Sequence, residues 1–321
     1  MKKVTLIIPC YNEEEMIHLL YKELCVAAEK LHNMEDIQYE TEMIFIDDGS
    51  KDKTLECIKE LREHDSRIRY LSFSRNFGKE AAMYAGFCNA SGDYAAVMDA
   101  DMQDPPSLVP EMVKIIESGD YDSVAARRVS RKGEMVIRSC FARLFYKIMN
   151  KMLDSDIKDG ARDFRLMKRE MVQVIIEMKE YNRFSKGIFG WIGFRTYWYE
   201  YENVERAAGI SKWNFLSLIR YSLDGILNFS WVPLAVIPIL GIICVLAALV
   251  FGMVILVRKG SGTEFAFGWE VLVCIIAFFS GLQMMCIGMV GQYISKIYQE
   301  SKNRPHYIAR EASDEDMKKI L

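Results

Sequence analysis

Short apolar runs alternate with stretches of helical spacing over the first part of the chain. Apolar runs of strand length occupy residues 4–8, 42–46, 69–73 and 94–98. Such runs, bounded by turn residues, are typical of strands that are buried on both faces. The segments that lead to residues 31, 64 and 90 instead carry apolar side chains at helical intervals. The alternation predicts an α/β fold with a mostly parallel sheet covered by helices.

Two uncharged stretches near the C-terminal end are long enough to span a membrane. Residues 231–257, taken as a helix, would extend about 40 Å, whereas the hydrocarbon core of a bilayer is roughly 30 Å thick. A second uncharged stretch covers residues 271–295, and the loop between them, 258–270, contains aromatic side chains typical of a membrane interface. Residues 213–229 place Arg220 and Asp224 among apolar side chains, which predicts an amphipathic helix on the membrane surface.

These patterns divide the chain into a cytosolic α/β domain (1–205), a hinge with the interfacial helix (206–230), two transmembrane helices (231–295) and a tail (296–321). Two spans put both ends of the chain on one side. Basic residues on the flanks favour the cytoplasm for that side, although Arg258 and Lys259 in the loop have the same charge. We therefore expect a multi-pass protein of the cytoplasmic membrane, with the α/β domain and both termini in the cytosol.

Net charge, cysteines and histidines give no indication of a nucleic-acid-binding, disulfide-linked or zinc protein. A net charge of −3 and a pI of about 6.0 give no basis for nucleic-acid binding. The eight cysteines form no C-x-x-C pair, which indicates reduced thiols in a cytosolic setting. The four histidines are scattered along the chain, so we do not expect a zinc site.

The most informative polar stretch follows the strand predicted at 94–98. Asp99 and Asp101 stand one residue apart, so in an extended segment they would point to the same side. At the carboxyl edge of a parallel sheet, two such carboxylates can hold a hard divalent cation, Mg²⁺ or Mn²⁺, and Gln103 can add an amide oxygen. An ordinary acidic turn would show the same pattern, and the motif alone does not decide between the two.

Other charged groups lie at the ends of neighbouring predicted strands. Asp47 and Asp48 could accept hydrogen bonds from a base or a ribose, or could cap the helix that follows. A fifth strand predicted at 123–126 runs into a basic loop, 127–132, which could bind an anion or be a solvated turn. A cation that neutralises a diphosphate, beside a membrane anchor, indicates a nucleotide-activated donor and a second substrate in lipid.

Six short motifs occur in order along the chain: IPCYNE (8–13), FIDDGS (45–50), SRNFGK (74–79), MDADMQDPP (98–106), DFRL (163–166) and R-x-x-G-x-S-K (206–212). With these motifs the chain resembles family 2 glycosyltransferases of GT-A fold. Within that family it is similar to polyprenyl-phosphate glycosyltransferases, of the bacterial undecaprenyl-phosphate glucosyltransferase type and the dolichol-phosphate mannose synthase type. The resemblance covers nearly the whole chain, including the two C-terminal spans.

The resemblance implies a role for each matching position. The nucleotide sugar would contact residues of the strand ends and of a segment that closes over the donor: Pro9, Tyr11, Glu13, Asp47, Asp48, Asp99, Arg206 and Lys212. The metal, Mg²⁺ or Mn²⁺, would be bound by Asp99, Asp101 and Gln103. The catalytic residues would be Asp163, Asp101 and Arg127. The phosphate of the lipid would be bound by Arg131, Arg138 and Arg143.

The chemistry of the implied reaction limits what a base must do. A polyprenyl phosphate is already ionised at neutral pH, so it can attack the anomeric carbon without losing a proton. Stabilisation of the leaving diphosphate and alignment of two anions would carry most of the catalysis. Asp163 could therefore act as a base, orient the sugar, or pair with Arg162 or Arg165. The family inverts the anomeric centre, which implies a β-linked product from an α-linked donor.

The donor and several alternatives stay open. Glucose from UDP-glucose is the first choice, with GDP-mannose, UDP-galactose and UDP-N-acetylglucosamine as other donors and a non-phosphate acceptor as a variant. A processive synthase would need more spans and a Q-x-x-R-W motif, where this chain has GWIGFR at 190–195. A dehydrogenase would need G-x-G-x-x-G after the first strand, and a non-catalytic scaffold would not need the charged positions. The small residues Gly281, Gly288 and Gly291 allow a homo-oligomer.

Overall fold

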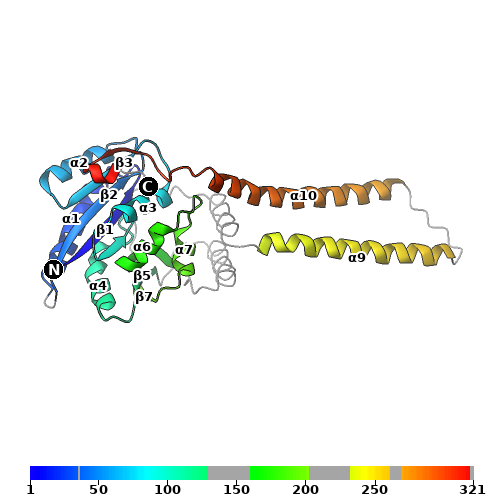
Figure 1. Ribbon diagram of the computed structural model, residues 1–321, viewed down its shortest axis with the longest axis horizontal. Helices are drawn as coiled ribbons and strands as arrows, with labels where there is room; N and C mark the ends of the chain where they lie inside the picture. The colour runs from blue at the N-terminus through cyan, green and yellow to red at the C-terminus, as the bar shows by residue number, and fades with distance from the viewer. Residues whose placement is uncertain (35–36, 129–159, 202–231, 261–268, 319–321) are drawn as a thin grey trace. The chain divides into compact units, whose positions relative to one another are not determined.

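The structure is a computed structural model that describes residues 1–34, 37–128, 160–201, 232–260 and 269–318. It divides into two units, Met1–Ser222 with Arg304–Leu321, and Leu223–Asn303. The first unit contains the sheet, and the second contains two long helices (Figure 1).

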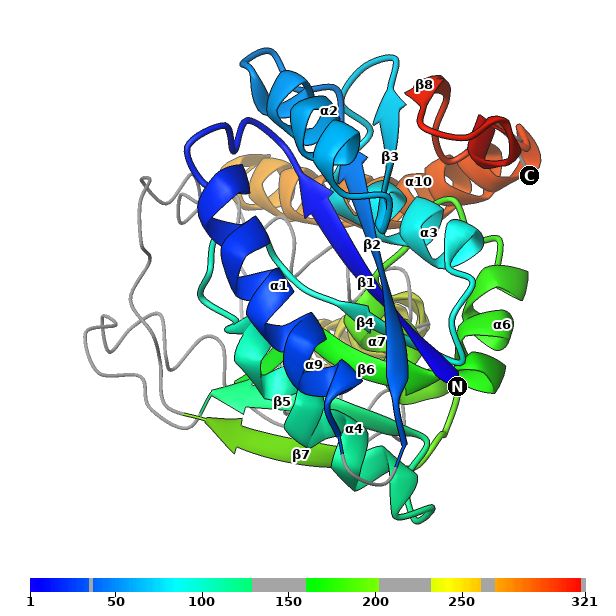
Figure 2. The same ribbon diagram turned by 90° about the vertical axis from the view of Figure 1, so that its left-hand side faces the viewer.

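The first unit is built on a sheet whose strands follow the apolar runs of the sequence. Within the described residues the strand order is β7-β5-β6-β4-β1-β2-β3-β8 (Figure 2). The pairs among β1 to β4 are parallel, as is β5 with β7, whereas β6 and β8 run antiparallel to their neighbours. The predicted α/β fold, a mostly parallel sheet covered by helices, is confirmed for this unit. The strands are β1 (Lys2–Cys10), β2 (Tyr39–Asp47), β3 (Ile68–Phe73), β4 (Tyr94–Val97), β5 (Ser123–Arg128), β6 (Ala161–Lys168), β7 (Thr196–Tyr201) and β8 (Ala309–Ala312).

Helices cover both faces of the sheet because successive side chains of a strand point to opposite faces. Met43 and Phe45 of β2 belong to one core with α1, α2 and α4, while Ile44 and Ile46 belong to another with α3. All four side chains are fully buried, which explains why this run is apolar without alternation. The helices are α1 (Ile17–His32), α2 (Thr54–His64), α3 (Lys79–Asn89), α4 (Val109–Glu117), α6 (Arg169–Glu177), α7 (Ser185–Trp191) and the short 3₁₀ helices η1 (Pro106–Leu108) and η2 (Glu315–Lys318).

The strand directions bring several loops to one edge of the sheet. Because β1 to β4 point the same way, their carboxyl ends, at Cys10, Asp47, Phe73 and Val97, lie along this edge. β6 runs antiparallel to β4, with Val97 opposite Arg165, so β6 contributes its beginning instead of its end. This carboxyl edge is where parallel sheets usually hold their ligands.

The last residues of the chain return to the sheet. β8 pairs antiparallel with β3 and covers an edge that would otherwise present unpaired backbone groups. Tyr307, only 4% exposed, stacks on Phe73 with ring centroids 4.8 Å apart. Arg69 Nε donates to Asp314 Oδ2 at 2.9 Å. Residues 304–318 thus form part of the first unit, whereas the sequence suggested only a tail at 296–321.

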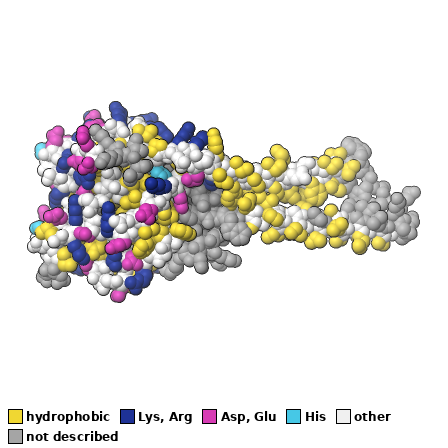
Figure 3. Space-filling view, in the orientation of Figure 1, with side chains coloured by type: hydrophobic (Ala, Val, Ile, Leu, Met, Phe, Trp, Pro, Cys, Tyr) yellow, Lys and Arg dark blue, Asp and Glu magenta, His cyan; other side chains and the backbone are white. Residues whose placement is uncertain are grey.

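The second unit contains α9 (Val232–Gly260) and α10 (Trp269–Ser301), and hydrophobic side chains dominate the visible surface of both (Figure 3). Among the described residues, one helical stretch, Ile275–Ser301, is long and apolar enough to cross a membrane. The apolar part of α9, Leu234–Val250, is shorter. The qualifying stretch overlaps the span predicted at 271–295, whereas the span predicted at 231–257 does not qualify, so the pair of transmembrane helices stays a proposal. The amphipathic helix predicted at 213–229 lies outside the described residues.

Replacing Tyr307 with alanine should lower the free energy of unfolding by roughly 3 kcal/mol, because a buried ring that stacks on Phe73 is lost. Chemical denaturation of the detergent-solubilised protein measures the change. Ile308→Ala is the matched control, since Ile308 is the next residue and is 45% exposed. Its loss should stay within about 1 kcal/mol. Equal losses in the two variants would show that Tyr307 does not hold this segment.

Candidate active site

The D-x-D motif runs into a turn, with Asp99 just before it and Asp101 within it. β4 ends at Val97, and the chain turns over residues 100–103, where Met102 has a positive φ of 60°. The Asp101 side chain stabilises this turn, because its Oδ1 accepts a hydrogen bond from the Gln103 N–H at 3.2 Å. The expectation that Asp99 and Asp101 share one side of an extended segment is therefore wrong, although both follow β4 at the carboxyl edge.

A lysine links Asp99 to Asp163. Lys79, the first residue of α3, places its Nζ 2.6 Å from Asp99 Oδ1 and 2.6 Å from Asp163 Oδ2. The antiparallel pairing of β4 with β6 brings the two aspartates to neighbouring strands. Burial alone would raise the pKa of Asp163, but the Lys79 ammonium outweighs it and holds that pKa well below its usual range. Asp163 is therefore a weak base in this arrangement.

An ion pair with a buried carboxylate adjoins the turn. Asp104, 1% exposed, accepts hydrogen bonds from Arg162 Nε at 3.0 Å and from the Tyr201 hydroxyl at 2.5 Å. Arg162 Nη2 also donates to Gln103 Oε1 at 2.7 Å. Burial raises the pKa of Asp104, although the Arg162 guanidinium opposes the shift. Arg162 thus fixes the amide of Gln103, one of the predicted metal ligands, from the adjacent strand.

Asp48 fixes the loop that leads into α3. Its two carboxylate oxygens accept hydrogen bonds from the backbone N–H groups of Phe77 at 2.6 Å and Gly78 at 2.9 Å. Gly78 has a φ of +97°, a conformation that glycine adopts without strain. Burial raises the pKa of Asp48 to about 6 in spite of the two hydrogen bonds. Asp48 therefore sets the position of the backbone from which Lys79 extends.

The loops after β1 and β2 are tied together at the same edge. Asp47, 1% exposed, accepts hydrogen bonds from the Ser50 N–H at 3.0 Å and the Ser72 hydroxyl at 2.6 Å. The Glu13 N–H donates to Thr54 Oγ1 at 2.8 Å. The structure thus places the predicted nucleotide-binding residues of the first two strand ends in one region: Pro9, Tyr11, Glu13, Asp47 and Asp48.

Arg127, one of the predicted catalytic residues, lies near the carboxyl end of β5. β5 is antiparallel to β6, with Arg127 opposite Ala161, so this end reaches the same edge of the sheet. Arg127 Nη1 is 2.9 Å from Glu200 Oε1 of β7. Five other predicted site residues lie outside the described residues: Arg131, Arg138, Arg143, Arg206 and Lys212.

Sequence reasoning gave no role to Lys79 or Asp104 and considered Arg162 only as a partner for Asp163. Lys79 and Asp104 stand inside the SRNFGK and MDADMQDPP motifs, and membership of a motif was the signal that could have singled them out. Their partners depend on β6 lying beside β4, which nothing in the local sequence shows.

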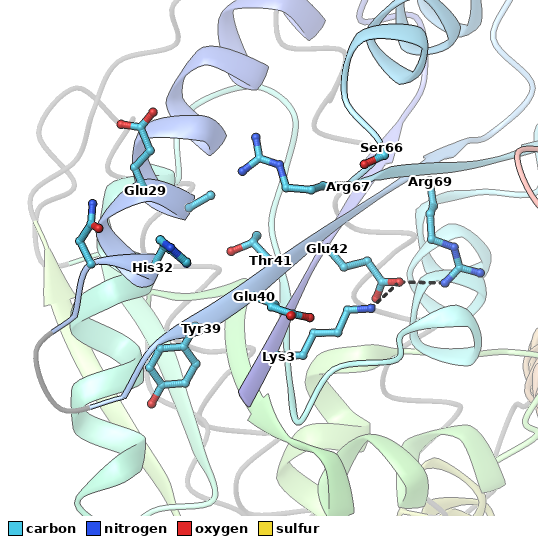
Figure 4. A pocket seen from close by; sticks show the side chains of 12 residues that line it. Lys3, Glu29, His32, Tyr39, Glu40, Thr41, Glu42, Ser66, Arg67 and Arg69 are labelled. Atoms are coloured by element: carbon cyan, nitrogen blue, oxygen red, sulfur yellow. Dashed lines mark hydrogen bonds and ion pairs between the residues drawn. The ribbon is translucent and has the colours of Figure 1, made fainter. Parts of the chain in front are cut away.

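A cavity of about 480 Å³ lies at the opposite edge of the sheet, lined by the beginnings of β1 to β3 and the end of α1 (Figure 4). Lys3 and Arg69 both pair there with Glu42, at 3.4 and 2.9 Å. The carboxylates that the motifs single out, Asp48 and Asp99 among them, follow strand ends at the carboxyl edge, so we place the candidate site there.

Comparison with known proteins decides the family. Residues 5–176 match the model of the family described as glycosyl transferase family 2. The chain belongs to this family. The CsbB protein of Bacillus subtilis (strain 168), whose name assigns it provisionally to the glycosyltransferases, is 41% identical over 97% of this chain and 92% of its own length.

A bactoprenol glucosyl transferase of Shigella phage SfV is 38% identical over 96% of this chain and 98% of its own length. A solved structure of glucosyl-3-phosphoglycerate synthase from Mycobacterium tuberculosis, in complex with Mn²⁺, UDP-glucose and phosphoglyceric acid, is 18% identical with a TM-score of 0.45. That similarity covers 71% of this chain and 78% of the other. The likeness to the curated relatives thus extends over nearly the whole length of both chains.

Replacing Arg162 with methionine should lower the free energy of unfolding by about 3 kcal/mol, because the Asp104 carboxylate stays buried without its cation. The double variant Arg162→Met, Asp104→Asn should recover most of the loss, since no charge is then left buried. Chemical denaturation measures both. Lys114→Met, which removes an exposed pair with Glu111, is the control and should change stability by less than about 0.5 kcal/mol. Additive losses in the double variant would contradict the assignment.

Proposed function

We propose that this protein transfers glucose from UDP-glucose to a polyprenyl phosphate, with inversion at the anomeric carbon. The observation that carries the proposal is the similarity over nearly the full length, long helices included, to a bactoprenol glucosyl transferase. The carboxylates at the carboxyl edge supply the acidic site that a nucleotide diphosphate and its cation require. The product would be a lipid-phosphate-linked sugar for the modification of cell-surface glycans.

Asp99, Asp101 and Gln103 would bind the divalent cation, Mg²⁺ or Mn²⁺. All three offer oxygen atoms, the ligands that both ions prefer, and Mg²⁺ often takes only one or two carboxylates besides substrate phosphates. Among the described residues, no group of three or more His, Cys, Asp or Glu side chains is placed to hold a metal. When bound, the cation would neutralise the diphosphate.

The protein's own groups would bind and align two anions. The nucleotide would lie on the loops after β1 and β2, where Asp48 would accept hydrogen bonds from the ribose. Arg127 would stabilise the negative charge that develops on the leaving diphosphate. Because the acceptor phosphate is already ionised, the reaction needs no strong base. Asp163, held by Lys79, would orient the sugar instead of accepting a proton.

The acceptor would be bound where the membrane meets the α/β domain. The residues proposed for its phosphate are Arg131, Arg138 and Arg143, and those for closure over the donor are Arg206 and Lys212. Two transmembrane helices within 231–295, preceded by an interfacial helix within 206–230, would anchor the domain to the cytoplasmic face of the inner membrane. Gly281, Gly288 and Gly291 on α10 would provide a small-residue face for a homo-oligomer.

The reaction is tested with purified protein, undecaprenyl phosphate, Mg²⁺ or Mn²⁺, and a panel of radiolabelled nucleotide sugars. Label that enters the organic phase reports transfer to the lipid. We expect transfer from UDP-glucose. If only another nucleotide sugar serves as donor, the proposed reaction type holds and the assignment of UDP-glucose is wrong. Absence of transfer from every donor, by a folded protein that binds UDP, would contradict the proposed acceptor.

Asp101→Asn should reduce kcat at least about a hundredfold, because one negative ligand of the cation that stabilises the leaving diphosphate is removed. The Gln103 N–H can still donate to the asparagine oxygen, so the turn and the thermal stability should be retained. Transfer rates across a Mg²⁺ titration measure the effect. Asp120→Asn, at an exposed position, is the control. A near-normal rate in Asp101→Asn would remove Asp101 from the metal site.

The affinity for UDP should rise as the pH increases from about 5 to about 7. Burial raises the pKa of Asp48 to about 6, so its ionised form, which accepts ribose hydrogen bonds more strongly, is lost as the pH falls through that value. Calorimetric titration at several pH values measures the dependence. In Asp48→Asn, the part of the pH dependence that comes from Asp48 should disappear. Only the part that comes from ionisation of the UDP phosphate should remain. Identical slopes in the two proteins would place Asp48 away from the nucleotide.

A further inference from the structure

Lys79 stands where the cation of the candidate site would bind. Its ammonium is 2.6 Å from one oxygen of Asp99 and 2.6 Å from one oxygen of Asp163. We propose that Lys79 is an internal cation of this site, which occupies the Asp99 carboxylate while the donor is absent and releases it when the divalent cation binds. The inference rests on the proposed function and names a positioning residue for the metal and the diphosphate.

The two carboxylates need a positive charge between them. Asp99 follows β4 and Asp163 lies near the beginning of β6, and these strands are adjacent and antiparallel. The side chains are 27% and 18% exposed, so water screens their mutual repulsion only in part. Among the described residues, the Lys79 ammonium contacts both carboxylates. Lys79 therefore offsets part of the negative charge of this pair before the donor arrives.

A divalent cation on Asp99 would compete with this ammonium. Mg²⁺ binds oxygen ligands at about 2.1 Å, so an ion of this kind held by Asp99 would lie close to Nζ. Two positive centres that close repel each other strongly when they are partly removed from water. Metal binding through Asp99 therefore requires Lys79 to move away from Oδ1.

The Lys79 side chain can move while its backbone stays in place. It is 40% exposed and has a flexible four-carbon stem, while its backbone position is fixed by the hold of Asp48 on Phe77 and Gly78. Asp163 is a second anchor, so an ammonium that leaves Asp99 can keep its contact with Asp163. The positive charge then remains at the edge of the sheet where the diphosphate would enter.

Manganese binding to the full-length protein without nucleotide tests the proposal. Free Mn²⁺ is measured by EPR during titration of the wild type, Lys79→Met and Lys79→Gln. Both variants should bind Mn²⁺ about tenfold more tightly, because a competing positive charge within about 4 Å is gone. At saturating Mn²⁺, UDP should bind both variants more weakly, because no ammonium then faces the diphosphate. A purely structural role for Lys79 would not shift the two affinities in opposite directions.

Lys114→Met is the matched control, since it removes a lysine from an exposed pair with Glu111, and it should alter neither affinity. Thermal unfolding verifies that each variant is folded. If the methionine variant does not fold, the glutamine variant is used instead, because it keeps a hydrogen-bond donor for Asp163. An Mn²⁺ affinity within about twofold of the wild type in a folded variant would overturn the proposal. Because the readout needs no transfer, a chain that binds Mn²⁺ as expected but transfers no sugar would contradict the proposed function alone.

Discussion

Two carboxylates on neighbouring strands repel each other unless a cation lies between them, and the candidate site depends on this constraint. Asp99 and Asp163 are brought together by the pairing of β4 with β6, and the Lys79 ammonium contacts both. The same concentration of negative charge is what attracts a divalent cation and, through it, a diphosphate. The need for positive charge beside Asp99 and Asp163 thus links the fold to the chemistry proposed for the site.

The site contains one ion pair that positions side chains and another whose lysine can change partners. Asp104 is buried, and its partner Arg162 holds the amide of Gln103 in place. The pair of Lys79 with Asp99 is partly exposed, and its lysine is free to change partners. The buried Asp104 carboxylate thus belongs to the part that positions the site, and the exposed Lys79 ammonium to the part that can respond to a ligand.

The sequence predicts the parts of the site that depend on local pattern. Apolar runs indicate the parallel strands, and because such strands end at one edge, Asp47, Asp48 and Asp99 could be placed together in advance. Partners set by long-range pairing could not be predicted. Lys79 meets Asp163 only because β6 lies beside β4. Likewise, Tyr307 covers Phe73 only because the chain returns to β3, and a short polar segment carries too weak a periodic signal to predict β8.

A structure of the protein with Mn²⁺ and UDP bound tests the central claim most directly, namely that the carboxyl edge binds the donor diphosphate through a cation held after β4. Anomalous scattering locates the manganese. We expect the ion to be bound directly by carboxylate oxygens of Asp99 and Asp101, with UDP on the loops after β1 and β2 and Lys79 withdrawn from Asp99. Nucleotide or metal bound instead in the cavity beside Glu42, at the opposite edge, would contradict the account.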